Sequence, residues 1–105
     1  MKVVELKSVK VGWREIGISE PEQNPFGDQW VYKSADTIYK ALVANGAKFD
    51  KSPMLAGMAS EPSVEFEFDG DRFTFQLELF LAIATKYENK KSLEKIKQIL
   101  EVLEE

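Results

Sequence analysis

"SVEFEFDGDRFTFQL", Ser63 to Leu77, is the stretch that decides the fold. On both sides of its central Asp-Gly-Asp, apolar residues alternate with polar ones. The apolar positions are Val64, Phe66, Phe68, Phe73, Phe75 and Leu77. Because successive side chains of a strand point to opposite faces, the pattern predicts a half-buried hairpin over residues 63–76 with one aromatic and one acidic-polar face.

The Asp-Gly-Asp tip permits two registers. A type I′ turn at Asp-Gly pairs Phe66 with Phe73, whereas a type II′ turn at Gly-Asp pairs Phe68 with Phe73. We favour the second register, since it also places Asp69 beside Arg72. A metal site at the tip is not expected, because a hard cation needs about six oxygen ligands.

Residues 3–18 add further strand to this hairpin. Their apolar alternation changes phase twice, and each change needs a bulge or a turn, for which Ser8 and Gly17 are the candidates. We therefore expect a bent strand or a two-stranded ribbon here. Together with the hairpin it makes an antiparallel sheet of three to four strands.

Three helices are expected, at about 35–45, 77–88 and 92–104. In the first, Ser34 is the candidate N-cap and Asn45-Gly46 supplies the stop. The second segment is apolar nearly all round, which is typical of a buried helix.

The segments at 77–88 and 92–104 each leave a point open. Alternation could carry the strand of 72–76 as far as Leu79 before the second helix begins. The last helix, which Ser92 would cap, has one apolar face that suits either a core or a homodimer contact. A further short helix would open at Ser52-Pro53.

These elements predict a two-layer α+β fold with the helices packed on one face of the sheet. The polar face of the 63–76 hairpin needs water, so the helices are expected on the other face. The chain has 105 residues, the usual size of one domain, and we expect a single compact domain over 1–105.

The composition removes several kinds of chemistry. Cysteine and histidine are both absent, which excludes thiolate nucleophiles, Cys/His zinc sites and Ser-His-Asp triads. Neither phosphate-binding glycine motif occurs. We therefore expect no enzyme, no cofactor and no metal site, and keep a metal-dependent enzyme using surface carboxylates as the last alternative. Glu65 and Glu67 lie two apart on one strand face, but a catalytic pair needs two carboxyls across a cleft, so a solvated strand face is favoured. Few arginines and many Lys and Glu fit a thermophilic source.

The chain carries a net charge of −4 and no long apolar run. The longest strongly apolar stretch, 77–85, is far shorter than the ~20 residues that span a bilayer, and no signal-peptide pattern follows Met1. We expect a cytoplasmic protein with no membrane contact.

Two apolar loops point to a protein partner. The turn Asn24-Pro25-Phe26-Gly27 holds Phe26 at a corner, which favours its exposure, while Trp30 and Tyr32 are expected to be buried. The proposed partner-binding residues are Phe26, Met54, Leu55 and Met58. The sequence thus favours a non-enzymatic interaction domain that docks on another protein and inhibits it or assembles with it.

The alternative is a nucleic-acid-binding strip on the N-terminal segment. Its residues are Lys2, Lys7, Lys10, Trp13 and Arg14. Trp13 could stack on a base, but the negative charge of the rest of the chain argues against a phosphate backbone as ligand.

A third of the chain, "VEFEFDGDRFTFQLELFLAIATKYENKKSLEKI", resembles the strand, Asp-Gly turn, strand, helix pattern of some phage tail-assembly chaperones. The resemblance implies a helix directly after the hairpin and a viral or mobile-element origin. It also adds assembly chaperone to the functions that a docking domain could serve.

Overall fold

The computed structural model describes residues 1–8, 10–21, 27–54, 62–77 and 80–103. Within these ranges six strands form one antiparallel sheet in the order β1-β2-β6-β5-β4-β3. The strands are β1 (Val3–Leu6), β2 (Trp13–Ile18), β3 (Lys48–Phe49), β4 (Ser63–Phe68), β5 (Asp71–Gln76) and β6 (Leu81–Lys86). The helices are α1 (Trp30–Ala44) and α3 (Lys90–Glu101), each preceded by a 3-10 turn, η1 (Gly27–Gln29) and η2 (Tyr87–Asn89). The class is α+β, as predicted, but the sheet is larger than the expected three to four strands.

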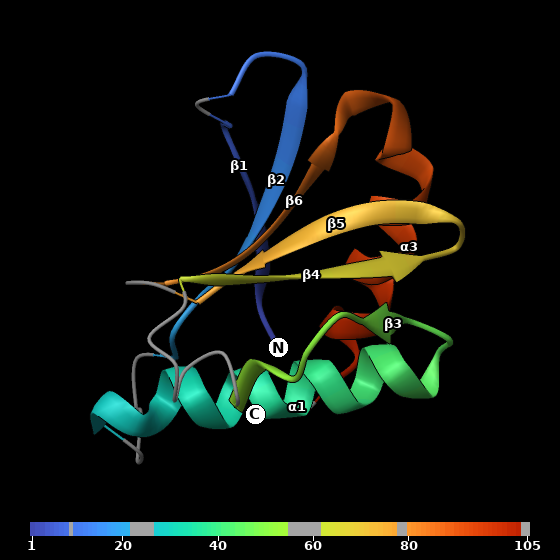
Figure 1. Cartoon of the computed structure of the whole chain (residues 1–105). Helices are drawn as coiled ribbons and strands as arrows, with labels where there is room; N and C mark the ends of the chain where they lie inside the picture. Colours follow the sequence, from blue (N-terminus) through green and yellow to red (C-terminus); the bar gives the residue numbers. More distant parts are fainter. Residues whose placement is uncertain (9, 22–26, 55–61, 78–79, 104–105) are drawn as a thin grey trace.

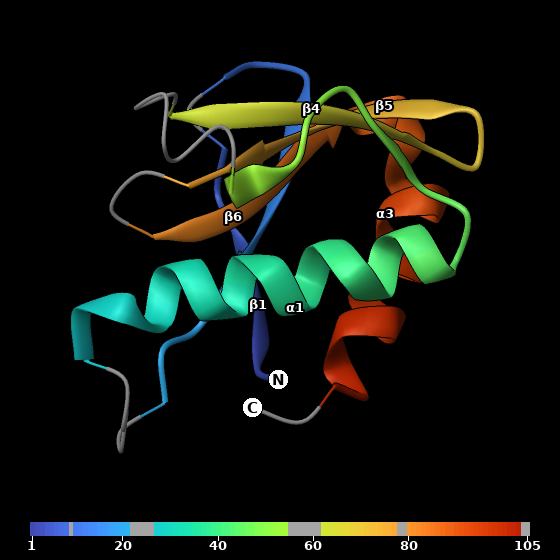
Figure 2. The same ribbon diagram turned by 60° about the horizontal axis from the view of Figure 1, so that its bottom comes forward.

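Both helices lie against one face of the sheet, which gives two layers (Figures 1 and 2). Across the sheet, Phe75 is opposite Ile83 and Ile83 is opposite Ile16, so these side chains share a face. They join Ile38 of α1 and Ile96 of α3 in one buried cluster. The predicted placement of the helices on the aromatic face of the hairpin is thus what the structure has.

The N-terminal segment is a two-stranded ribbon, one of the two forms expected. β1 pairs with β2 so that Val4 lies opposite Gly17. Leu6 packs over Gly17, where an added Cβ would come within 2.7 Å of the Leu6 Cδ1 atom. Gly17 therefore serves close packing inside a strand rather than the phase-changing turn suggested by the sequence.

The hairpin turns at Asp69-Gly70, so the favoured register was wrong. Phe66 lies opposite Phe73. Both turn residues have positive φ, 55° and 84°, as a type I′ turn requires, and aspartate tolerates this region better than most residues. Phe73 still contacts Phe68 diagonally, with ring centroids 6.5 Å apart, besides stacking on Phe66 at 5.2 Å.

The aspartates of the turn hold α3 rather than Arg72. Lys95 contacts Asp69 at 2.7 Å, and the buried Ser92 hydroxyl donates a hydrogen bond to Asp71. The predicted Asp69–Arg72 pair was therefore wrong, because Arg72 points to the polar face of the sheet. Ser92 is likewise not a cap, since α3 already begins at Lys90.

The predicted helix over 77–88 was also wrong, and with it the helix implied by the phage-chaperone resemblance. Residues 81–86 form β6, which lies between β2 and β5. Leu81 and Ile83 face the core, while Ala82 is equally buried on the other face. A strand buried on both faces has no polar alternation, which makes it hard to distinguish from a buried helix by pattern alone. The strand of 72–76 ends at Gln76, and Leu79 lies outside the described residues.

The helix predicted at 35–45 exists but begins five residues earlier. Since residues two apart on a helix point about 200° apart, Trp30 is buried, as predicted, whereas Tyr32 is 56% exposed. The expectation that Tyr32 is buried was wrong because it assumed a strand-like approach. α1 ends at Ala44, before Asn45 and Gly46, and the helix predicted at 92–104 is α3.

Replacing Phe73 should cost about 3–5 kcal/mol of unfolding free energy, because Phe73→Ala removes a fully buried ring that stacks on Phe66. Urea unfolding followed by circular dichroism measures this. Val102→Ala, at a position 80% exposed, is the control and should change the value by less than about 0.5 kcal/mol. Equal effects of the two changes would contradict the core described here.

Candidate binding groove

Four of the five residues of the predicted basic strip line one groove of about 360 Å³. They are Lys7, Lys10, Trp13 and Arg14. Lys2 is exposed but does not line it. The ribbon therefore gathers most of the strip, as its turn brings the end of β1 next to the start of β2.

The rest of the groove comes from the C-terminal part of the chain. Trp13 lies opposite Lys86 at the end of β6, and the backbone N–H of Tyr87 donates to the Gly12 carbonyl at 2.7 Å. The ribbon tip and η2 thus lie side by side at one end of the sheet (Figure 1). The first two turns of α3 complete the wall with Lys90, Leu93, Glu94 and Lys97.

Two aromatic residues that line the groove have cations over their rings. The ammonium of Lys10 lies 4.1 Å from the centroid of the half-buried Trp13 ring. Over Tyr87, whose side chain is 55% exposed, lie the Arg14 guanidinium at 5.3 Å and the Lys90 ammonium at 5.5 Å. Such contacts stabilise exposed sites by about 0.5–1 kcal/mol each, so they hold the cations near the rings.

The groove is cationic in an acidic protein. Five cationic and three acidic residues line it, which sum to a charge of +2 in a chain of net −4. Arg14 is 4.0 Å from Glu5. Among the described residues, no carboxylate lies within ion-pair distance of the four groove lysines: Lys7, Lys10, Lys90 and Lys97.

Of the predicted partner-binding residues, the structure describes one. Met54 is 47% exposed and lies by a shallow hollow with Tyr32, Lys33 and Asp36 of α1. Phe26, Leu55 and Met58 lie outside the described residues. Pro53 and Met54 are helical, in line with the short helix expected there.

A further apolar patch was not predicted. Phe80, 46% exposed, borders a hollow with Val4, Leu6 and Gly17 on the sheet face opposite the helices. The sequence pattern did not indicate this patch, because Phe80 was assigned to a buried helix.

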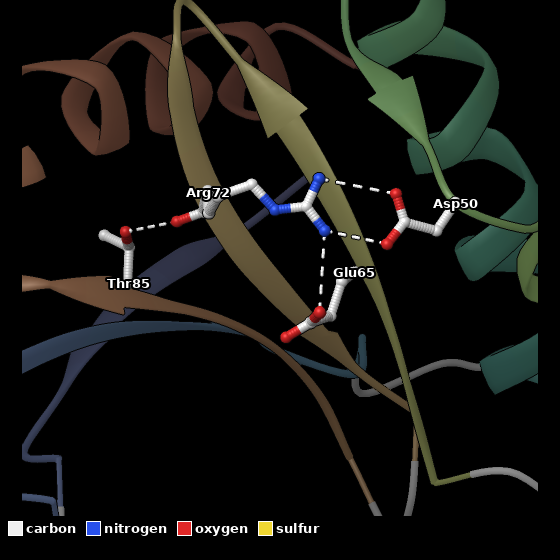
Figure 3. A network of polar contacts seen from close by, with 4 residues as sticks. All are labelled: Asp50, Glu65, Arg72 and Thr85. Carbon is white, nitrogen blue, oxygen red and sulfur yellow. Dashed lines mark hydrogen bonds and ion pairs between the residues drawn. The ribbon is translucent and has the colours of Figure 1, made fainter.

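A polar network on the same open face ties the edge of the sheet together (Figure 3). Arg72 of β5 binds both carboxylate oxygens of Asp50, at 2.7 and 3.3 Å, and approaches Glu65 of β4 at 3.5 Å. From the neighbouring strand β6, the Thr85 hydroxyl donates a hydrogen bond to the Arg72 backbone carbonyl at 2.7 Å. Glu65 is thus part of an ion pair on an open surface, which is not the cleft that a pair of catalytic carboxylates needs.

No three Asp or Glu side chains of the described part of the chain come close enough together to hold a metal ion. Neither described helix is long and apolar enough to cross a lipid bilayer.

In comparisons with known proteins, no protein-family model, curated protein or solved structure matches the chain.

Sequence reasoning missed the C-terminal half of the groove. Tyr87, Lys90 and Lys97 are more than 70 residues from Trp13, and only the pairing of β2 with β6 brings them to it. With residues 77–88 assigned to a helix, nothing in the sequence could place Tyr87 beside the ribbon tip.

The Asp50 carboxyl should titrate below its usual value. The hydrogen bonds from Arg72 hold the pKa of Asp50 below 3.8, and the pairing raises the pKa of Arg72. A folded-state pKa below the unfolded one contributes stability that is present above the unfolded pKa and lost as the pH falls through the folded one. In Arg72→Gln, a ¹³C-NMR carboxyl titration should show the Asp50 midpoint moving back up towards 3.8, and an unmoved midpoint would contradict the pairing.

Proposed function

We propose that this chain is a non-enzymatic protein-interaction domain that docks a partner protein in the groove between the β1–β2 tip and α3. It would act by inhibiting that partner or by assembling with it. The observation that carries the proposal is the partly exposed Tyr87 ring with Arg14 lying over it, in a hollow that Trp13 also lines. Trp, Tyr and Arg are the residue types that most often dominate binding energy at protein interfaces.

The surroundings of these three residues suit an interface. Val11, at the tip of the ribbon, is 99% exposed and borders the groove, so it offers an apolar contact at its rim. The ribbon and η2 are joined by pairing of β2 with β6, which presents the anchors on regular structure. Such pre-organisation lowers the entropy cost of binding.

Position-specific photo-crosslinking tests the docking site. A photoreactive amino acid replaces either Val11, at the groove, or Val102, another strongly exposed valine, which directly follows α3. In extract of the native host, the chain labelled at position 11 should form a discrete adduct with one protein, and the chain labelled at 102 should not. Tyr87→Ala should reduce the adduct at least tenfold, since it removes a central anchor.

Two outcomes would count against this site. Equal adducts from both positions, or an adduct unaffected by Tyr87→Ala, would show that the groove does not select a partner. Loss of the adduct in Tyr32→Ala, whose ring is as exposed as that of Tyr87, would move docking to the hollow beside Met54.

A second function, single-stranded nucleic-acid binding, is favoured by the clustering of the predicted strip with Lys90 and Lys97. Contact with three or four phosphates would make the affinity fall with salt, with a log-log slope of roughly −2 to −3. Fluorescence anisotropy with labelled oligo-dT and oligo-U, from low to moderate salt, measures this. If neither oligonucleotide binds at low salt, this function is removed.

A further inference from the structure

We infer that the groove selects an acidic segment of its protein partner, one that presents several Asp or Glu side chains around an apolar residue. This inference rests on the proposed docking function and names the chemistry of the segment. It follows from the way charges are distributed along the groove walls.

Four lysines of the groove lining have no carboxylate partner among the residues that the structure describes. They come from three places, the ribbon (Lys7 and Lys10), the start of α3 (Lys90) and its second turn (Lys97), and converge on one groove. Within the described residues each lacks an ion-pair partner. A partner that covers them removes water from the ammonium groups, which is costly unless it supplies negative charge.

The glutamates of the groove lining favour an acidic peptide over a phosphate backbone as the ligand. Glu5, Glu15 and Glu94 also line the groove. A nucleic acid carries a charge at every phosphate and would meet these carboxylates wherever it crosses the groove. A polypeptide can place its carboxylates at the lysines and neutral or basic side chains at the glutamates, so the mixed lining favours a peptide.

Both aromatic residues of the groove lining already have cations over their rings. Lys10 lies over Trp13, while Arg14 and Lys90 lie over Tyr87, so cations already occupy ring surface that a base would need for stacking. A partner carboxylate can contact those cations without displacing them. An apolar partner side chain can then pack on the exposed part of Tyr87 and on Val11.

The charge outside the groove also favours an acidic segment as the ligand. With +2 in the groove and −4 over the whole chain, the remaining residues carry −6. An acidic segment is therefore repelled by most of the surface and attracted by one end of the molecule, which orients the encounter.

Selection from a display library of random 12-residue peptides tests the inference on the full chain. Peptides recovered on the wild-type protein should be enriched in Asp and Glu relative to the library. A synthetic, labelled copy of a recovered peptide should bind more weakly as salt is raised. The triple variant Lys10→Glu, Lys90→Glu, Lys97→Glu should bind it at least roughly 30-fold more weakly.

A matched variant controls for the change in net charge. Lys33→Glu, Lys40→Glu and Lys48→Glu reverse three exposed lysines outside the groove, and binding should stay within about threefold of wild type. Circular dichroism and thermal melting verify that both variants fold. If the groove variant does not fold, Lys90→Gln alone and the salt dependence of the wild-type protein decide the question.

The outcomes distinguish this inference from the docking proposal. Recovered peptides that depend on the groove lysines but show no acidic enrichment would overturn the acidic assignment and leave docking intact. No recovered peptides, or peptides that bind the groove variant as well as wild type, would overturn both. Oligo-dT or oligo-U that binds more tightly than the peptides, with binding lost in the groove variant, would replace the acidic segment by a nucleic acid.

Discussion

The pairing of β6 on both of its edges is the interaction on which the rest of the structure depends. On one side β6 pairs with β2 and on the other with β5, so it joins the N-terminal ribbon to the 63–76 hairpin in a single sheet. The row Ile16, Ile83 and Phe75 runs across this junction and forms the floor on which α1 and α3 pack. Without β6 the β1–β2 ribbon would have little apolar surface to pack against. An isolated two-stranded sheet is only marginally stable in water.

The same pairing builds the groove. Because Trp13 lies opposite Lys86, the chain leaves β6 beside the ribbon tip, and η2 and α3 follow along its flank. The hydrogen bond from Asn89 to the Thr85 hydroxyl, at 2.9 Å, fixes this exit, and the same hydroxyl is bonded to β5. The groove is therefore a consequence of sheet register rather than of a local motif.

The elements that the sequence could predict are those with contact to water on one side. The 63–76 hairpin alternates because its second face is polar, and α3 has an apolar stripe opposite a charged face. The second face of β6 carries Ala82 and Ala84 in place of polar residues, so its pattern matches helix as well as strand. The register of the turn was open for another reason, because both turn types place Gly70 in a conformation that glycine allows. In the structure the type I′ turn occurs together with contacts of Asp69 and Asp71 to α3, and the sequence alone does not show such contacts.

For the candidate site, the sequence could identify the residue types of the N-terminal strip but not the residues that the fold places beside them. A basic strip with one tryptophan suggests nucleic acid when it is considered alone. Once Tyr87 and the start of α3 lie beside it, the strip becomes one wall of a groove in which carboxylates are interspersed with cations. A uniform cationic surface attracts any polyanion, whereas alternating charge discriminates among ligands by where their charges fall. The proposal of a polypeptide ligand rests on this mixed charge, which comes from residues that the fold brings together from the two ends of the chain.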